Sequence, residues 1–388
     1  MKRLLLALVW AALLVLAAAD FGHAAVINTT WFNGAADYNW GTVGNWVSGV
    51  PNNNPTDQYI PQIYAGDTIQ VNGQFTINAL ELYNPFGILN FSYGSSLALV
   101  TGTSINDGQI RLNDISPSGT NQARLFINGA VNLSGTGSVE FATNYQNEIS
   151  GGGYLTMGLG HTIHAGSGTN GYINVGMTNQ GIVNAEGGTI ALATNNKVNQ
   201  GVIQAIDDGG SVGGTLNITG ITVDNTAGTL GVYDHSTINL NNSVIKGDIS
   251  GNGNVDVAGT STIDGSGTGG AELTPTITTG YGQILHLKGS ITNNGQIRLN
   301  DISSASYNQA RLFIDGAVNL GGTGSVEFLT SYQNQINDGG SGYLTVGSGQ
   351  TIRAGTGTKG YINVGMTNQG AVSAEGGTIT LQATDKVN

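Results

Sequence analysis

The chain has 388 residues and no cysteine, and only 9% of its residues are charged, against about a quarter in an ordinary soluble domain. Its 24 acidic residues outnumber its 12 lysines and arginines, and this net charge of −12 argues against a nucleic-acid partner, which requires basic side chains to neutralise phosphates. The absence of cysteine excludes the small exported domains that depend on disulfides, and the 39% of hydrophobic residues, which recur periodically, argue against a disordered chain.

Residues 1–25 have the parts of a secretory signal peptide. Met1, Lys2 and Arg3 form a short basic start, residues 4–19 are an almost unbroken apolar run, and small residues surround two cleavage points, at 17–19 and 22–25. A membrane anchor is the alternative, but the run is shorter than the ~20 residues of a spanning helix. We therefore expect a secreted or cell-surface protein, extracellular or at the outer membrane of a bacterium, whose mature chain does not insert into a membrane.

Residues 26–75 differ in composition from the rest of the mature chain. They hold Trp31, Trp40 and Trp46 and three of the six prolines. An atypical, aromatic segment before a repetitive region is typical of a cap, which covers the apolar interior and the unpaired strand edges at the end of a repeat protein. The functional alternative is that the three indoles form a platform that binds a sugar ring.

A long block of sequence occurs twice in the remaining part, residues 76–388. The copies, residues 108–199 and 295–388, both begin Gly-Gln-Ile-Arg-Leu-Asn-Asp-Ile-Ser and both contain Gly-Tyr-Ile-Asn-Val-Gly-Met. The offset between them changes from 187 to 189 residues in a glycine-rich tract after Gln146 and Gln333. We expect these two extra residues to lie in a loop, because glycine clusters mark turns.

Apolar and polar residues alternate throughout residues 76–388, as at Ile110 and Leu112 or at Ile173 and Val175. Period two indicates short strands with one buried face, and the Asn-Gly, Asp-Gly and Gly-Gly pairs between them suit tight corners. Antiparallel hairpins of a sandwich also use such turns. Equivalent strands recur at about one coil length, however, which favours an all-β fold, a parallel β-solenoid expected to be a right-handed β-helix. Stacked coils would place Ile on Ile and Asn on Asn in hydrogen-bonded ladders.

The sequence stops inside the second copy, at Lys386-Val387-Asn388, where the first copy continues. We expect that the chain is a fragment of a longer protein and that an uncapped solenoid end could associate with another copy. With coils of ~20–25 residues, the repeats predict about a dozen coils in a rod of order 60 Å.

The tryptophan segment, Trp31-x8-Trp-x4-Asn-Trp-x2-Gly-x-Pro51, resembles the head sequence of bacterial surface proteins with autotransporter-type or adhesin-type β-helix passengers. The phrase Asn-x-Gly…Glu-Gly-Gly-Thr-Ile-x-Leu, at residues 179–192 and 368–381, is similar to their coil repeats. This resemblance covers nearly the whole mature chain, with motifs of low complexity. It implies a β-helix and a role in cell-surface display, adhesion or matrix building.

Parallel β-helices also include polysaccharide lyases and glycoside hydrolases, whose sites need clustered carboxylates on one outer face. The candidates for catalytic residues are Asp207 and Asp208, before a Gly-Gly turn, and Asp234 and His235, at the end of a strand-like segment. Adjacent residues in a strand point to opposite faces, so Asp234 and His235 could act together only across a bulge. We expect none of the four to be catalytic and the protein not to be an enzyme.

The two copies provide an internal comparison of the histidines. His161 and His164 of the first copy are replaced by Gln350 and Arg353 in the second, so that a site built on them would exist only once. A solvated coil surface is the simpler interpretation. The sequence has no Cys, His-x3-His or EF-hand pattern, and we therefore expect no metal site and no cofactor.

Charged residues that both copies share, such as Arg111 with Glu140 and their equivalents Arg298 with Glu327, are expected to pair across coils. Exposed pairs of this kind contribute at most ~1 kcal/mol each.

The sequence thus favours an exported, non-catalytic β-solenoid that acts as an adhesin or structural passenger, with a polysaccharide or a host or neighbouring cell surface as partner. The first alternative is a polysaccharide lyase or glycoside hydrolase on the same scaffold. The second is an inert spacer of a larger surface protein.

Overall fold

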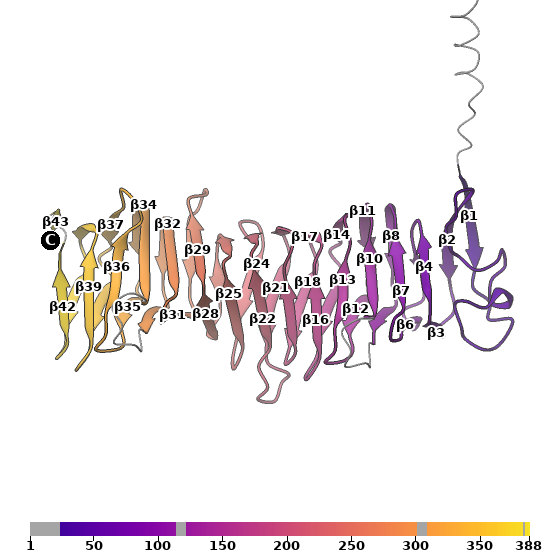
Figure 1. Cartoon of the computed structure of the whole chain (residues 1–388), viewed down its shortest axis with the longest axis horizontal. Coiled ribbons are helices and arrows are strands. Elements are labelled where there is room, and N and C mark those ends of the chain that lie inside the picture. Colours follow the sequence, from indigo (N-terminus) through magenta and orange to yellow (C-terminus); the bar gives the residue numbers. More distant parts are fainter. Residues whose placement is uncertain (1–23, 114–121, 301–308, 383–384) are drawn as a thin grey trace, which may run out of the picture.

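The computed structural model describes residues 24–113, 122–300, 309–382 and 385–388. In these ranges the chain forms an all-β parallel solenoid of about 13 turns, which confirms the predicted fold class. The strands lie side by side along one long axis, with the tryptophan segment at one end and β43 (Lys386–Val387) at the other (Figure 1). The only helical element in the described ranges is the 3-10 turn η1 (Val43–Asn45). The predicted signal peptide lies, up to residue 23, outside the described residues.

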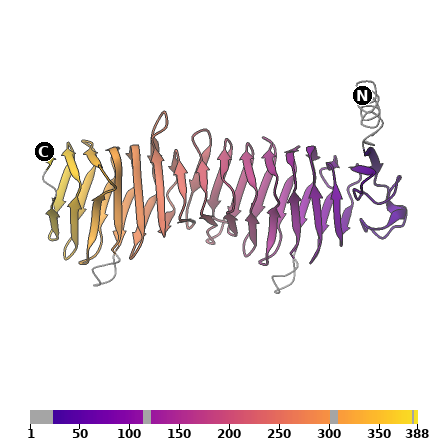
Figure 2. The ribbon, with the colours of Figure 1, turned by 45° about the horizontal axis from the view of Figure 1, so that its top comes forward.

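Each coil has three strands, and each strand pairs in parallel with the equivalent strand of the next coil, so that the rod has three faces. Such pairs follow one another along the rod (Figure 2), so that the open edges of the three faces lie at its two ends.

Face 1 consists of β1 (Ala25–Thr30), β2 (Asp57–Ile63), β5 (Glu81–Leu82), β8 (Gly102–Asn106), β11 (Ala130–Ser134), β14 (Tyr154–Met157), β17 (Gly176–Asn179), β20 (Lys197–Asn199), β23 (Thr222–Asp224), β26 (Val244–Lys246), β29 (Thr260–Gly265), the first halves of β32 (Ile284–Asn293) and β34 (Arg311–Gly321), β36 (Asn334–Asp338), β39 (Lys359–Asn363) and β42 (Thr378–Leu381).

Face 2 consists of β3 (Thr68–Val71), β6 (Ile88–Phe91), β9 (Gln109–Leu112), β12 (Ser138–Phe141), β15 (Thr162–Ala165), β18 (Ile182–Glu186), β21 (Val202–Ile206), β24 (Thr229–Val232), β27 (Ile249–Ser250), β30 (Ala271–Leu273), the second halves of β32 and β34, β37 (Tyr343–Val346), β40 (Gly365–Asn368) and β43.

Face 3 consists of β4 (Gln74–Ile77), β7 (Ser96–Leu99), β10 (Arg124–Ile127), β13 (Asn147–Ser150), β16 (Asn170–Ile173), β19 (Thr189–Leu192), β22 (Thr215–Thr219), β25 (Thr237–Asn241), β28 (Asn254–Ala258), β31 (Thr276–Gly280), β33 (Gln296–Asn300), β35 (Ser325–Phe328), β38 (Thr351–Ala354) and β41 (Ala371–Ala374).

Alternation places the apolar side chains inside the coils, where they stack on equivalent side chains. On face 2, for example, Val139 lies in register with Ile110 and Ile163, and all three are fully buried. Every coil adds such a layer on each face, so that the core is one continuous column along the rod.

Asparagine ladders line the inside of one corner, as the sequence predicts. The buried Asn179 donates from Nδ2 to Oδ1 of Asn199 at 2.8 Å, and Asn199 donates in the same way to Asn225 at 2.6 Å. The second copy repeats this contact between Asn368 and Asn388 at 2.7 Å. Each of the first two bonds satisfies the amide oxygen of an asparagine that is buried.

The two copies of the duplicated block lie on different faces. The strand that begins Gln-Ile-Arg-Leu is β9 on face 2 in the first copy and β33 on face 3 in the second. The next strand of the block is β10 on face 3 and then the first half of β34 on face 1. Between β9 and β33 the chain makes eight coils and one further strand, so that the second copy is shifted by one face around the axis.

The two-residue difference between the copies lies in the turn between β36 and β37, which confirms the prediction of a loop. Oδ1 of Asp338 accepts hydrogen bonds from the amides of Gly340, at 2.7 Å, and Gly342. These bonds hold the pKa of Asp338 below its usual value, so that the turn is braced by a carboxylate.

Candidate functional site

The first pair of candidates for catalytic residues, Asp207 and Asp208, lies in the turn between β21 and β22, at the corner of faces 2 and 3. Oδ1 of Asp207 accepts from the amide of Gly209 at 3.2 Å. Asp208 accepts the hydroxyl of Ser167 at 2.5 Å and the amide of Gly210 at 3.0 Å. The bond from Ser167, followed by that from Gly210, lowers the pKa of Asp208, and both carboxylates brace the turn.

The second pair, Asp234 and His235, lies in the corresponding turn of the next coil. His235 has φ 59°, and Asp234 accepts a hydrogen bond from the side chain of Asn252. The two turns pack closely, since a Cβ on Gly213 would lie 1.8 Å from the carbonyl oxygen of His235. The structure therefore brings all four candidates to one corner, although no ion pair within the described residues joins them.

The three tryptophans of the N-terminal segment form one buried cluster. Trp31 and Trp46 are 3% exposed and Trp40 is fully buried, with ring centroids 5.1 Å apart for Trp31 and Trp46 and 4.8 Å for Trp40 and Trp46. Each indole N–H is satisfied: Trp31 donates to Asp67 at 2.9 Å, Trp46 to the carbonyl of Trp40 at 2.8 Å, and Trp40 to that of Pro51 at 3.3 Å. These rings offer no exposed face to a sugar, and their packing against the first coils is that of a cap.

The strands β2 and β3 of this segment already pair with the coil strands β5 and β6. The cluster is therefore continuous with the column of core side chains.

His161 corrects one prediction from the sequence, because it is fully buried and does not lie on a solvated surface. Its Nε2 lies 2.8 Å from Nδ2 of Asn106, and burial lowers its pKa to about 4, so that the ring is neutral at ordinary pH. In the second copy Gln350 takes this place and bonds Asn293, the equivalent of Asn106. The imidazole and the amide occupy the same buried corner because each accepts a hydrogen bond from the side chain of the asparagine there.

Shared charged residues pair across coils as predicted. Nε of Arg111 lies 2.8 Å from Glu140, and the equivalent distance from Arg298 to Glu327 is 3.8 Å. In the second copy Arg353 also reaches Glu327, at 2.5 Å. His164 of the first copy therefore corresponds to Arg353, which with Arg298 and Glu327 forms a row of alternating charges on three successive coils.

Face 1 holds a charged cluster that the sequence analysis did not single out. Both carboxylate oxygens of Asp315 lie 2.9 Å from Nδ1 of His286, whose ring stacks on Phe313 at 5.1 Å. Beside it, Nζ of Lys288 lies 3.6 Å from Asp264. The pair His286 and Asp315 is separated by 29 residues and joins two coils, so that only knowledge of the strand register could have found it.

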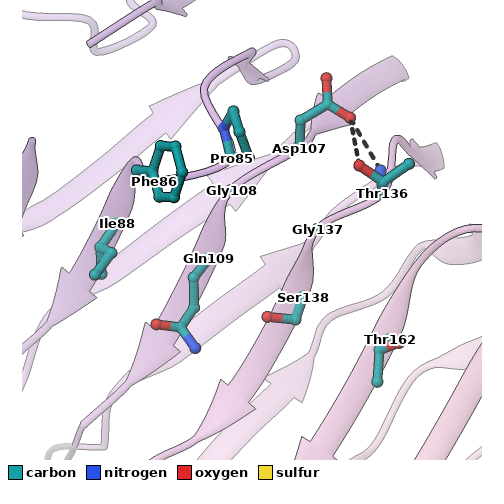
Figure 3. Close-up of a pocket in the computed structure, with 10 residues that line it drawn as sticks. All are labelled: Pro85, Phe86, Ile88, Asp107, Gly108, Gln109, Thr136, Gly137, Ser138 and Thr162. Atoms are coloured by element: carbon teal, nitrogen blue, oxygen red, sulfur yellow. Dashed lines mark hydrogen bonds between the residues drawn. The ribbon is translucent and has the colours of Figure 1, made fainter. Parts of the chain in front are cut away.

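An open groove of about 500 Å³ runs over the corner of faces 1 and 2 (Figure 3). The backbone of Gly108 and Gly137 lines its floor. These two glycines approach so closely that a Cβ on Gly137 would lie 2.1 Å from the carbonyl oxygen of Gly108, which leaves no room for a side chain. Asp107 closes one side by accepting from the amide of Thr136 at 2.9 Å, while Gln109 and Ser138 point outward from the strands. The groove offers amides and hydroxyls to a ligand, with Phe86 exposed at its edge.

The second copy builds an equivalent groove of about 620 Å³ at the corner of faces 2 and 3. Asn294 replaces Asp107 and accepts from the amide of Thr323 at 3.0 Å, and Gln296 and Ser325 replace Gln109 and Ser138. The shift by one face therefore applies to surface features as well as to strands.

No group of three or more His, Cys, Asp or Glu side chains suited to a metal ion occurs among the described residues. Within the same ranges no helix is both long and apolar enough to cross a bilayer. Comparison of the chain with protein-family models, characterised proteins and solved structures found no match.

Proposed function

We propose that this protein is an exported, non-catalytic rod that works at a cell surface or outside the cell as an adhesin or structural scaffold, and that its partner is a polysaccharide or a cell-surface glycan. The proposal rests mainly on the polarity of the side chains that the outer faces of the rod expose. Rigid ladders present rows of uncharged polar side chains, for example Thr189, Thr215 and Thr237 in register on face 3. Such rows offer many hydrogen-bond groups to a sugar polymer without a deep pocket.

The contacts of two candidates for catalytic residues, Asp207 and Asp208, support a non-catalytic role. The carboxylates of Asp207 and Asp208 bind backbone amides of their own turn. A general acid needs a raised pKa, whereas that of Asp208 is lowered.

A polysaccharide lyase or hydrolase is the second candidate, and the cluster of His286 and Asp315 favours it. An imidazole held by a carboxylate through Nδ1 leaves Nε2 as a base. An inert spacer in a larger surface protein is the third candidate, and it predicts no binding at all.

The test is a binding and cleavage screen of the purified chain against plant, algal and bacterial polysaccharides. Saturable retention without new reducing or unsaturated ends supports the proposal. Cleavage that is lost in His286→Ala or in Asp208→Ala would replace it by the enzyme, and absence of both binding and cleavage would leave the spacer.

A further inference from the structure

One exposed tyrosine on face 1 lies flat on the next coil. The ring of Tyr154 covers Gly176, where a Cβ would lie 2.9 Å from Cδ2 and 3.2 Å from Cε2. Its hydroxyl is 2.8 Å from Oγ1 of Thr178, two residues further along the same strand. The ring is thus held against the sheet at both ends, and since the side chain is 42% exposed, its other face is open to solvent.

The second copy has the same arrangement on face 2. A Cβ on Gly365 would lie 2.9 Å from Cδ2 of Tyr343, and the hydroxyl of Tyr343 is 2.8 Å from Oγ1 of Thr367. The tyrosine is 36% exposed. Substitution of either glycine by a larger residue would lift the ring, so that glycine is required by the close approach.

The positions around each ring are small or uncharged in both copies. Tyr154 lies in register between Ala130 and Gly176, and Thr156 lies between Asn132 and Thr178. We call these six residues platform 1. Platform 2 consists of the identical residue types at Ala317, Asn319, Tyr343, Thr345, Gly365 and Thr367.

We infer that each platform binds the pyranose ring of an uncharged polysaccharide by stacking on its tyrosine. This inference rests on the proposed function and specifies its site and its class of partner. The open ring face suits the C–H face of a sugar, and the asparagine and threonine side chains suit its hydroxyls. Neither platform contains a charged residue that could pair with an ionic polymer, and the net charge of −12 on the chain repels an anionic one.

The two platforms face different directions. Platform 1 is on face 1 at β14 and platform 2 on face 2 at β37, eight coils and one strand further along the rod (Figure 1). This corresponds to ~40 Å along the axis. A straight polymer chain that lies on one platform does not pass over the other, so that one rod holds two chains and cross-links them.

The test uses the wild-type chain and the variants Tyr154→Ala, Tyr343→Ala and the double variant, with Tyr233→Ala as a control at another tyrosine that is 36% exposed. The probes are soluble galactomannan, xyloglucan and dextran, in affinity electrophoresis for binding and in turbidity for cross-linking. Circular dichroism verifies that each variant folds.

We expect the wild type and Tyr233→Ala to bind one of these polymers and to cross-link it. Each single variant should keep about half of the binding sites and lose cross-linking, and the double variant should bind at least tenfold more weakly. A folded double variant that binds like the wild type overturns the platforms but leaves the proposed function standing. A wild type that binds none of the three polymers overturns the platforms, and the wider polysaccharide screen then decides whether the proposed function stands.

Discussion

Replacement of Lys197 by methionine probes the cost of a charge inside the rod. Lys197 points inward from β20, in register with the core residues Met177 and Val223, and is fully buried. Its Nζ donates to the carbonyl oxygens of Ala193, at 3.0 Å, and Asn195. Among the described residues no carboxylate lies within ion-pair distance of Nζ, and burial lowers its pKa from 10.5 to about 7.

The lowered pKa makes the stability of the wild type depend on pH. The unfolded chain binds a proton at Lys197 up to its ordinary pKa, whereas the folded chain releases it above about pH 7, so that stability rises with pH between these two values. Below about pH 7 the amine is protonated in both the folded and the unfolded chain, and the folded chain carries the full cost of a buried charge. The difference between the two pKa values corresponds to about 5 kcal/mol, at 1.36 kcal/mol per pKa unit. Methionine removes this penalty but also removes both hydrogen bonds of the amine. The carbonyl of Ala193 keeps the amide of Asn195 as a donor, at 2.8 Å, whereas the carbonyl of Asn195 loses the donor that Lys197 supplied, and we take the cost as about 2 kcal/mol.

We therefore expect Lys197→Met to be more stable than the wild type by about 3 kcal/mol near pH 6 and less stable by about 1 kcal/mol near pH 10, where the unfolded lysine is still mostly protonated. Urea unfolding followed by circular dichroism at several pH values measures this difference. Lys246→Met, on the outer side of β26, is the control and should show the same pH profile as the wild type. If the profile of Lys197→Met also runs parallel to that of the wild type, the reasoning about the buried amine is wrong.

Three further substitutions test the ladders and corners. Asn199→Ala removes the middle amide of the buried ladder and should lower the free energy of unfolding by about 2 kcal/mol. The control, Asn239→Ala in an outer ladder, should lower it by under about 0.5 kcal/mol. Similar values for the two variants in urea unfolding would contradict the role of burial. Gly137→Ala forces a Cβ onto a backbone oxygen and should cost at least about 2 kcal/mol, while Gly152→Ala, with open space around its Cβ, should change the unfolding free energy by under about 0.5 kcal/mol. Asp208→Ala should speed thermolysin cleavage between residues 207 and 213 without changing polysaccharide binding. In the wild type, acid should also loosen this turn. The pKa of Asp208 is lower in the folded chain than in the unfolded chain, so that its carboxylate stabilises the turn above the unfolded pKa and this stabilisation is lost as the pH falls through the folded pKa.

The sequence by itself determined the fold class and the lining of the corners. Alternation with period two specifies which side chains point inward, and this property is local to each strand. Repetition of Asn179 at Asn199 predicted the ladder, because equivalent residues of successive coils meet in a parallel solenoid. The cross-coil pairing of Arg111 with Glu140 follows from the same reasoning and is confirmed. The prediction of the tryptophan cap has another ground, the aromatic composition of residues 26–75, and the three rings are buried together in the core.

Only the tertiary structure decided which face each strand occupies. Coil length varies, for example 17 residues between Thr237 and Asn254 and 29 between Gln296 and Ser325, so that the face on which a strand lies depends on the sum of many unequal coil lengths. The shift of the second copy by one face, the pairing of His286 with Asp315 and the position of Tyr154 over Gly176 all depend on that sum. A period-two pattern carries no information about it, because the pattern specifies the inward or outward direction of a side chain and not its neighbour on the next coil.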